Sequence, residues 1–314
     1  MISRLVAALL LAGTVAAAAP QYAGLIARYP APALAGVHSR ELKFLIDPGK
    51  VKDTPAAAFS QLWARIQAAG AGAGFAVTEK PNMPLKVTSG YQEYFETPGQ
   101  ELWQKGYLIR VSRQLGATGK KHKAPGALAE LTFKSILPDY KETLAMPLLL
   151  AGAKGKAKLE DNVALGPGGG LSSYLEKVVS IDLPPADLGG LTLGEFARYL
   201  PELAGLGIPA GTRLQGTRAY TVEVEPGHVQ LEGAAPCKVH LAGWSTQPGE
   251  KPYLYTFSIK YECQDFYHDA QTHASGERFL VQVVQGGLAD LAFADGEKWC
   301  GSAVRKLMNR PMPR

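Results

Sequence analysis

The stretch Glu41-Leu42-Lys43-Phe44-Leu45-Ile46 begins with charged and apolar side chains in alternation. Successive side chains of a β-strand point to opposite faces, so Glu41 and Lys43 share one face while Leu42 and Phe44 share the other. The same division recurs in residues 130–134, Glu-Leu-Thr-Phe-Lys. These patterns predict strands that have one apolar face and one charged face.

Turn residues and alternation predict further strands at residues 107–113, 129–136, 218–225, 238–243 and 254–262. Helical periodicity predicts helices at residues 55–69, 193–206 and 297–309. Residues 116–126 and 152–170 are rich in Gly and Lys, and we expect exposed loops there. Many strands with few helices predict a β-dominated α+β domain with peripheral helices.

The charged strand faces allow two interpretations. An antiparallel sheet commonly has one face in water, and the charged residues would then be solvated. Alternatively, the strands close into a barrel whose polar face points inward. Such a lumen would collect Lys and Arg for an anionic ligand, and carboxylates for a divalent cation.

The N-terminus has the parts of a secretory signal: a basic residue, Arg4, an apolar run at residues 5–12 and small residues at 15–19. The apolar run is shorter than the roughly 20 residues that a permanent membrane helix needs. We therefore expect a signal peptide at residues 1–18, no membrane anchor after its cleavage, and a periplasmic or secreted protein. Residues 19–37 are expected to form an Ala/Pro-rich arm, and residues 38–314 a single domain with a C-terminal helix.

Hydrophobic residues make up 46% of the 314 residues, enough for a sizeable core, and the formal net charge is +5. This mild excess does not predict a nucleic-acid partner, which requires a strongly basic face. The 6 histidines have no metal-binding spacing, and we assign them to the surface or to loops. No feature predicts an oligomeric state.

The chain has 3 cysteines, Cys237, Cys263 and Cys300. An oxidising compartment would allow one disulfide and leave one thiol. Cys237 opens one expected strand and Cys263 closes the next, so we prefer a Cys237–Cys263 disulfide over Cys263–Cys300.

Five segments together resemble the CYTH, or triphosphate tunnel metalloenzyme, superfamily. Residues 41–46 resemble its first-strand Glu-x-Glu-x-Lys signature, and Tyr94-Phe95-Glu96-Thr97-Pro98 resembles its Tyr-Phe-Asp-Thr-Pro segment. Residues 106–110 fit its glycine followed by Leu-Arg-x-Arg, and residues 130–134 fit Leu-Thr-x-Lys. Thr217-Arg218-x-Tyr220 resembles the later Lys-Thr-Arg segment. These segments follow the family's order over residues 38–265.

The resemblance implies an antiparallel eight-stranded tunnel-like barrel that binds triphosphates and hydrolyses phosphoanhydrides with Mg²⁺ or Mn²⁺. Catalysis would fall to Glu41, Lys43 and Lys134. The residues carried over as ligands of a small anionic phosphate compound are Lys43, Arg110, Lys134 and Arg218, and we add Lys260 as a further basic residue that would bind the anion. Those carried over as metal ligands are Glu41, Glu262 and Glu142.

Three positions depart from the family pattern. Ser39 replaces the first glutamate of Glu-x-Glu-x-Lys, Ser112 replaces the second arginine of Leu-Arg-x-Arg, and Lys260 stands where an acid is usual. A tunnel with fewer acids and an extra lysine should bind divalent metal more weakly and still attract anions. Either Glu130 or Glu223 compensates for the missing acid, or the hydrolytic site has decayed. Three hypotheses stay open: a metal-dependent triphosphate or polyphosphate phosphohydrolase, a non-catalytic anion-binding protein, and a β-domain that acts through its outer surface.

Overall fold

The computed structural model describes residues 36–82, 85–114, 129–135, 137, 139–152, 155–183, 191–263 and 269–309. The predicted signal peptide, most of the predicted arm and the predicted loop at residues 116–126 lie outside the described residues. None of the described helices is long and apolar enough to span a membrane.

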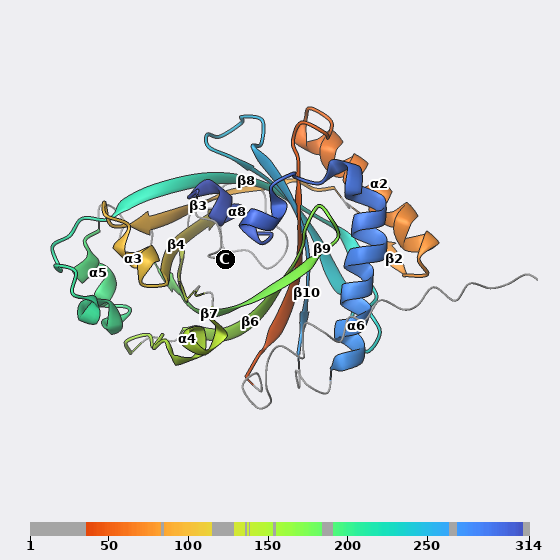
Figure 1. The fold of residues 1–314 in the computed structure, drawn as a ribbon. Helices are drawn as coiled ribbons and strands as arrows, with labels where there is room; N and C mark the ends of the chain where they lie inside the picture. Colours follow the sequence, from red (N-terminus) through yellow and green to blue (C-terminus); the bar gives the residue numbers. More distant parts are fainter. Residues whose placement is uncertain are drawn as a thin grey trace, which may run out of the picture.

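Ten strands form one sheet in the order β2-β8-β3-β4-β5-β7-β6-β1-β10-β9, and β8 also pairs with β9. The second pairing closes the sheet into a ring from which only β2 is left out (Figure 1). The strands are β1 (Ser39–Ile46), β2 (Val77–Glu79), β3 (Thr88–Glu96), β4 (Tyr107–Gln114), β5 (Ala129–Ser135), β6 (Lys156–Leu165), β7 (Leu171–Leu183), β8 (Gln215–Val229), β9 (Cys237–Ser245) and β10 (Leu254–Glu262).

The predicted β-dominated barrel with peripheral helices is confirmed, but its details differ from an antiparallel eight-stranded tunnel. The ring contains nine of the strands, and β1 pairs with β6 in parallel. The difference arises partly in residues 152–170, which contain β6 instead of the predicted exposed loop. β6 and β7 form a hairpin across Gly166–Gly170, where the Gly166 amide donates to the Gly170 carbonyl at 2.8 Å. The glycines mark the turn of this hairpin, and buried Val163 and Leu165 precede it.

Helices cover the outer face of the ring on two sides. The described helical segments are α2 (Pro55–Gly72), α3 (Glu101–Gln104), α4 (Tyr140–Ala145), α5 (Leu193–Ala197), η2 (Pro201–Leu206), α6 (Ala270–Phe279), the π-helical η3 (Leu280–Gln285), α7 (Gly286–Leu288), η4 (Ala289–Leu291), η5 (Gly296–Trp299) and α8 (Ala303–Leu307). The predicted helix at 55–69 is α2, whereas those at 193–206 and 297–309 are each divided into two short helical segments.

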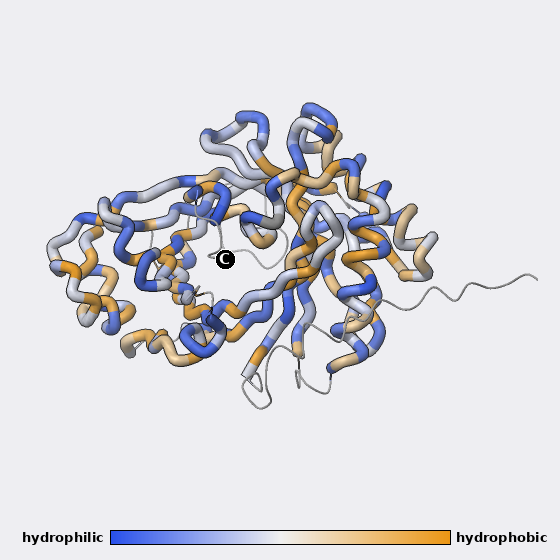
Figure 2. The backbone as a smooth tube through the Cα atoms, viewed as in Figure 1, coloured by the Kyte–Doolittle hydropathy of each residue, from blue (hydrophilic) through white to orange (hydrophobic). Residues whose placement is uncertain are grey.

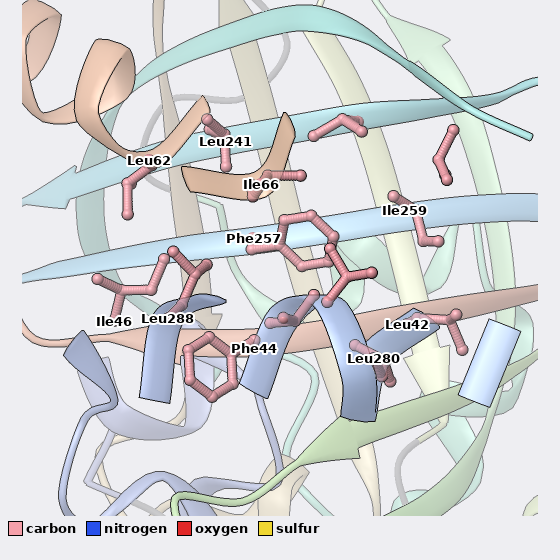
Figure 3. Close-up of a cluster of buried hydrophobic side chains, with 14 of the residues drawn as sticks. Leu42, Phe44, Ile46, Leu62, Ile66, Leu241, Phe257, Ile259, Leu280 and Leu288 are labelled. Atoms are coloured by element: carbon pink, nitrogen blue, oxygen red, sulfur yellow. The ribbon is translucent and has the colours of Figure 1, made fainter. Parts of the chain in front are cut away.

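α2 begins where the sequence predicts it, because Thr54 accepts a hydrogen bond from the Ala57 amide and Pro55 fits the first turn. Its buried residues Leu62 and Ile66 lie on the side of Leu241 of β9 and Phe257 of β10 (Figure 3). Leu42 and Phe44 of β1 belong to the same buried cluster. The η3 and α7 residues Leu280 and Leu288 complete this core. Figure 2 shows apolar residues concentrated between the strands and helices α2 and α6. The outer face of β1 is therefore the buried apolar face that the alternation predicts.

All three cysteines are free, so the preferred Cys237–Cys263 disulfide is absent. The register of β9 and β10 explains this. Val239 pairs with Ile259, and continuing this antiparallel register brings Tyr261, not Cys263, opposite Cys237. The two cysteines are thus out of register by two residues.

Candidate functional site

A cavity of about 200 Å³ lies inside the ring of strands, on the face opposite to the helix-covered core. Glu41 and Lys43 of β1 line it, while the intervening Leu42 lies in the core. The other lining residues are Gln92, Tyr94, Leu108, Arg110, Lys134, Glu176, Glu223, His240, Trp244, Thr256, Phe257, Ser258, Gly301, Ser302, Ala303 and Val304. The charged face of the predicted strands is therefore a lumen.

Three cations that the sequence predicted converge in this cavity: Lys43 from β1, Arg110 from β4 and Lys134 from β5. Arg110 donates to the Thr132 hydroxyl at 3.2 Å. Among the described residues no carboxylate lies within ion-pair distance of its guanidinium, and its Nε makes no hydrogen bond. The charge of Arg110 is therefore available to an anionic ligand.

Each carboxylate that lines the cavity is held by a basic side chain. Glu41 Oε2 lies 3.1 Å from Lys43 Nζ, and Glu176 Oε2 accepts a hydrogen bond from Lys134 Nζ at 2.7 Å. Burial opposes ionisation of Glu176, but Lys134 and Lys43 outweigh it and lower its pKa to about 2. Burial likewise opposes ionisation of Glu41, and Lys43 outweighs it, so the pKa of Glu41 is lowered. Both acids are ionised, and both are neutralised locally.

His240 of β9 forms a third pair, its Nε2 lying 3.2 Å from Glu223 Oε2 on β8. Burial disfavours the imidazolium, but the hydrogen bond and charge of Glu223 outweigh it and raise the pKa of His240 above its usual value. The assignment of every histidine to the surface or to loops was wrong for two of them. His240 lies on the inner face of β9, since Val239 and Leu241 on either side of it belong to the core. His273 is buried on α6.

Arg218, also predicted as a phosphate ligand, lies on the outer face of the ring. It pairs by register with Glu93, whose neighbours Gln92 and Tyr94 line the cavity. Alternation therefore directs Glu93 and Arg218 away from the lumen. Arg218 Nη2 contacts Glu93 Oε2 at 2.9 Å, the guanidinium lies over the Tyr91 ring, and the side chain is 41% exposed.

Lys260 lies on the inner face of β10, because it pairs by register with Glu41. It does not line the cavity, and its ammonium contacts Glu160 of β6 instead. It is near enough to contribute to the lowered pKa of Glu41. Ser39, at the position of the missing glutamate, donates to the same Glu160 at 3.4 Å. Glu160 thus takes part in a charged group at the far end of the lumen.

The three predicted metal ligands do not meet. Only Glu41 lines the cavity. Glu262 is exposed at the end of β10, opposite Ser39, and Glu142 is exposed on α4. Among the described residues, no group of three His, Cys, Asp or Glu side chains could hold a metal ion. These residues therefore do not fit a resident Mg²⁺ or Mn²⁺ ion.

Glu176 and His240 are site residues that the sequence analysis missed, and Glu223 entered it only as one of two acids, with Glu130, that could compensate for the missing glutamate. A signal existed for the two glutamates, since Tyr174 and Glu176 share one face of β7, and Thr221 and Glu223 share one face of β8. The signal was too weak to use without knowing which face of each strand points inward.

The C-terminal segment, residues 296–309, occupies one end of the lumen. Val304 and Leu307 of α8 pack on Tyr94 and Leu108, which are inward-facing residues of β3 and β4. Trp299 packs on Leu45 of β1. Figure 1 shows α8 within the ring of strands. Residues 301–304 therefore form a wall of the cavity.

No protein-family model and no curated protein matches the sequence. Among solved structures, a candidate adenylyl cyclase from Hippeastrum with a dominant triphosphatase activity is similar at a TM-score of 0.39 and 13% identity, over 88% of this chain and 98% of that chain. A candidate adenylate cyclase from Bacillus halodurans is similar at a TM-score of 0.35 and 16% identity, over 74% of this chain and 83% of that chain. Another from Vibrio parahaemolyticus has a TM-score of 0.34 and 11% identity, over 87% of this chain and 99% of that chain.

Similarity at this level carries no inference about function, and the fold follows from the strand pairing described above. The residues on which the sequence resemblance rests provide an independent test. Glu41, Lys43, Arg110 and Lys134, taken from three separate segments of the resemblance, line one cavity inside a closed ring of strands. The barrel with a charged tunnel that the resemblance implied is thereby confirmed.

Proposed function

We propose that this protein binds a small polyanionic phosphate compound, of the triphosphate or polyphosphate class, inside the barrel. One observation carries the proposal: Lys43, Arg110 and Lys134 come from three different strands and project into one cavity. A chain of phosphate groups presents anionic oxygens along its length, so several cations at different positions can hold it at once. The guanidinium of Arg110 offers planar donors, and the two lysines offer compact charges.

The state of the carboxylates favours binding over metal-dependent hydrolysis. Glu41, Glu176 and Glu223 are each paired with a basic group, at 3.1, 2.7 and 3.2 Å respectively. A resident divalent cation would compete with those basic groups for the same oxygens. Metal-dependent hydrolysis of a triphosphate, which the family resemblance implies, is therefore the second candidate function. It requires that a cation arrive together with the phosphate ligand.

Calorimetric titration with inorganic triphosphate tests the proposal, first in EDTA and then with Mg²⁺ or Mn²⁺, alongside an assay of released phosphate. We expect binding in EDTA, and an affinity loss of about tenfold or more in Lys134→Ala, since charge-assisted hydrogen bonds contribute about 1.5 to 3 kcal/mol. Lys251→Ala is the matched control, because Lys251 forms a comparable pair with Asp53 at 3.0 Å but is exposed.

Three outcomes decide between the functions. Binding in EDTA without phosphate release identifies an anion-binding protein. Release of phosphate that depends on metal and is lost in Lys134→Ala identifies the hydrolase. A wild-type protein that neither binds nor hydrolyses triphosphate or longer polyphosphates overturns the proposal in both forms.

The location of the protein is a separate proposal, which the character of residues 1–18 supports. We propose that the chain is exported to the periplasm or secreted. Cell fractionation together with N-terminal sequencing of the mature protein tests it, and a mature protein in the cytosolic fraction that still begins at residue 1 or 2 would contradict it.

A further inference from the structure

The guanidinium of Arg305 is buried at the closed end of the tunnel. Arg305 lies on α8 and is 2% exposed. Its guanidinium carbon lies 5.2 Å from the centre of the Trp103 ring and 5.5 Å from the centre of the Tyr174 ring. Two aromatic faces thus hold a cation in a site shielded from water.

Two of the three guanidinium nitrogens of this buried cation lack the polar partners that buried cations normally have. Nε and Nη2 of Arg305 make no hydrogen bond to the described residues, and no described carboxylate lies within ion-pair distance. The buried hydroxyl of Tyr174 also has no partner among the described residues. Leaving charged donors unpaired in a protein interior is costly, so an acceptor supplied from outside the described protein groups would relieve the cost.

These unpaired groups adjoin the cavity that holds the other cations. Ser302 and Val304, neighbours of Arg305 in the chain, line that cavity, and so does Glu176, with which Arg305 interacts electrostatically. Tyr174 interacts in the same way with Lys43 and Glu176. Arg305 and Tyr174 are not themselves lining residues of that cavity, but both interact with Glu176, which is one.

A close backbone approach fixes the C-terminal segment in this position. Gly301 has φ +67°, and a Cβ atom there would lie 2.8 Å from Cβ of Ala164 and 3.0 Å from Cβ of Lys43. Only glycine combines this backbone conformation with such a contact. Gly301 therefore lies against β1 and β6, beside Lys43. The helix that follows it, α8, places Arg305 next to Tyr174.

We propose that Arg305 and Tyr174 form a further anion subsite at the closed end of the tunnel, which takes the innermost phosphate group of the bound chain. This inference rests on the proposed function and extends it. The planar guanidinium would donate through Nε and Nη2 to two oxygens of one phosphate group, and the Tyr174 hydroxyl would donate to a third. Because α8 occupies this end, the phosphate chain would enter from the opposite end of the tunnel.

The subsite also bears on ligand length. A single orthophosphate can bind at Lys43, Arg110 and Lys134 without reaching Arg305, whereas a longer chain can contact both groups of cations. Loss of Arg305 should therefore weaken the binding of triphosphate more than the binding of orthophosphate. A purely structural role for Arg305 would not produce this difference.

The test compares wild type, Arg305→Met, Tyr174→Phe and Arg278→Met by calorimetric titration with triphosphate and with orthophosphate in EDTA. Arg278 is the matched control, because its guanidinium also lies over a ring, that of Phe75 at 4.9 Å, but on α6 outside the barrel. We expect Arg305→Met to weaken triphosphate binding about 10-fold to 100-fold. Orthophosphate binding should change less than about threefold, and the ligand-free melting temperature should stay the same or rise, because an unpaired buried charge is removed.

Tyr174→Phe, which removes one neutral donor, should weaken triphosphate binding about threefold to tenfold. Arg278→Met should bind both ligands like wild type. If Arg305→Met does not fold, Arg305→Lys decides, because it keeps the charge and loses the planar fork. We expect it to bind triphosphate several-fold more weakly than wild type.

The subsite and the proposed function fail in different ways. A wild-type protein that binds no phosphate compound overturns the proposed function and the subsite with it. Wild-type binding together with unchanged triphosphate affinity in Arg305→Met, or in Arg305→Lys where that variant is needed, overturns the subsite alone. An equal loss for triphosphate and orthophosphate overturns it too, because it assigns Arg305 a general structural role.

Discussion

The two faces of β1 both bury charged side chains, but the charges are arranged for different purposes. On the outer face, Arg40 lies between the sheet and α6. On the inner face, Glu41 and Lys43 line the tunnel. The two sets are one residue apart in the sequence and are separated by the thickness of a strand.

The outer set is dry and has more acids than bases. Arg40, Asp161 and Glu277 are each 0% exposed. Arg40 Nε lies 2.7 Å from Asp161 Oδ2, and Nη2 lies 2.7 Å from Glu277 Oε1. Burial raises the pKa of both acids although Arg40 opposes the change. This set joins β1, β6 and α6, and none of its three side chains is exposed to solvent.

The inner set adjoins a cavity and has more bases than acids. Beyond the pairs at Glu41, Glu176 and Glu223, it contains Arg110 and Arg305, neither of which has an ion-pair partner among the described residues. Burial of charge on one strand therefore serves both stability and binding. The sign of the unpaired charge and the presence of a cavity distinguish the two roles.

The largest effect should come from breaking the outer set. Arg40→Met leaves two acids buried without their cation, and removing one partner of a buried ion pair destabilises a protein by about 3 to 5 kcal/mol. Urea unfolding followed by circular dichroism measures the loss. In buffer without urea, at a temperature at which the variant is folded, its affinity for triphosphate should equal that of wild type.

The control for Arg40→Met is the triple variant that also carries Asp161→Asn and Glu277→Gln. Neutralising both acids removes the unpaired negative charge, so the triple variant should recover part of the lost stability. If Arg40→Met alone is as stable as wild type, the outer set does not stabilise the fold and the contrast between the two faces disappears.

Glu176→Gln should act on both stability and binding, in opposite directions. The pKa of Glu176 is about 2 against a usual 4.5, so this group stabilises the folded state above its unfolded pKa, and the contribution is lost as the pH falls from about 4.5 to about 2. The variant should be less stable than wild type at neutral pH and equally stable near pH 2. Unfolding experiments at several pH values measure this difference.

The same substitution frees Lys134 and removes a negative charge from the tunnel, so triphosphate in EDTA should bind about threefold to tenfold more tightly. Glu93→Gln is the control, since Glu93 pairs with Arg218 on the outer face and should leave the affinity unchanged. Weaker binding by Glu176→Gln would indicate that this carboxylate contacts the ligand, directly or through a cation.

The His240 pair should make binding depend on pH. The groups that face His240 are Glu223 and Glu225 of β8 and Glu41 of β1, and together they raise its pKa. Protonated His240 adds a positive charge to the tunnel, so the affinity for triphosphate should fall as the pH rises through this pKa. The fall should be up to about tenfold for each unit by which bound triphosphate raises the pKa of His240. The histidine's contribution to stability has the same sign, present below pH 6.5 and lost as the pH rises through the folded pKa.

Triphosphate also titrates near neutrality, so His240→Gln must be measured over the same pH range. The difference between the two curves isolates the histidine. Parallel curves for wild type and His240→Gln would show that protonation of His240 makes no contribution to binding.

The sequence predicted the inner face of β1, β4 and β5 correctly because those strands alternate strictly. Lys43 and Lys134 point inward for the same reason that Leu42 and Phe133 point outward. The parallel β1–β6 pair could not be predicted in this way, because strand pairing depends on contacts across 121 residues, such as that between Arg40 and Asp161. Alternation defines the faces of a strand but not its neighbours.

The same limit explains the site residues that were missed or misplaced. Arg305 lies on a short helix far from every strand motif, and only the folded chain brings it to Tyr174. Glu142 and Glu262 were carried over from their positions in the sequence. Sequence position alone does not show that Glu142, on α4, and Glu262, at the end of β10, lie apart from the cavity. Residues whose role depends on an exact register, such as Arg218, are the ones that motif similarity predicts least well.

Arg218 should give the smallest effect and thereby sharpen the contrast between inner and outer faces. Family resemblance assigns it to the phosphate chain, whereas its register with Glu93 and its place over Tyr91 direct it to solvent. Arg218→Ala should change triphosphate affinity less than about twofold. Its stability cost should be at most about 1 kcal/mol, because exposed ion pairs contribute little. Raised salt should shrink that cost further.

Arg110→Ala, measured in parallel, should weaken binding about tenfold or more, since Arg110 is the inward-facing arginine of the same sheet. A comparable loss in both variants would place the ligand on both faces of the sheet and would overturn the assignment of binding to the lumen.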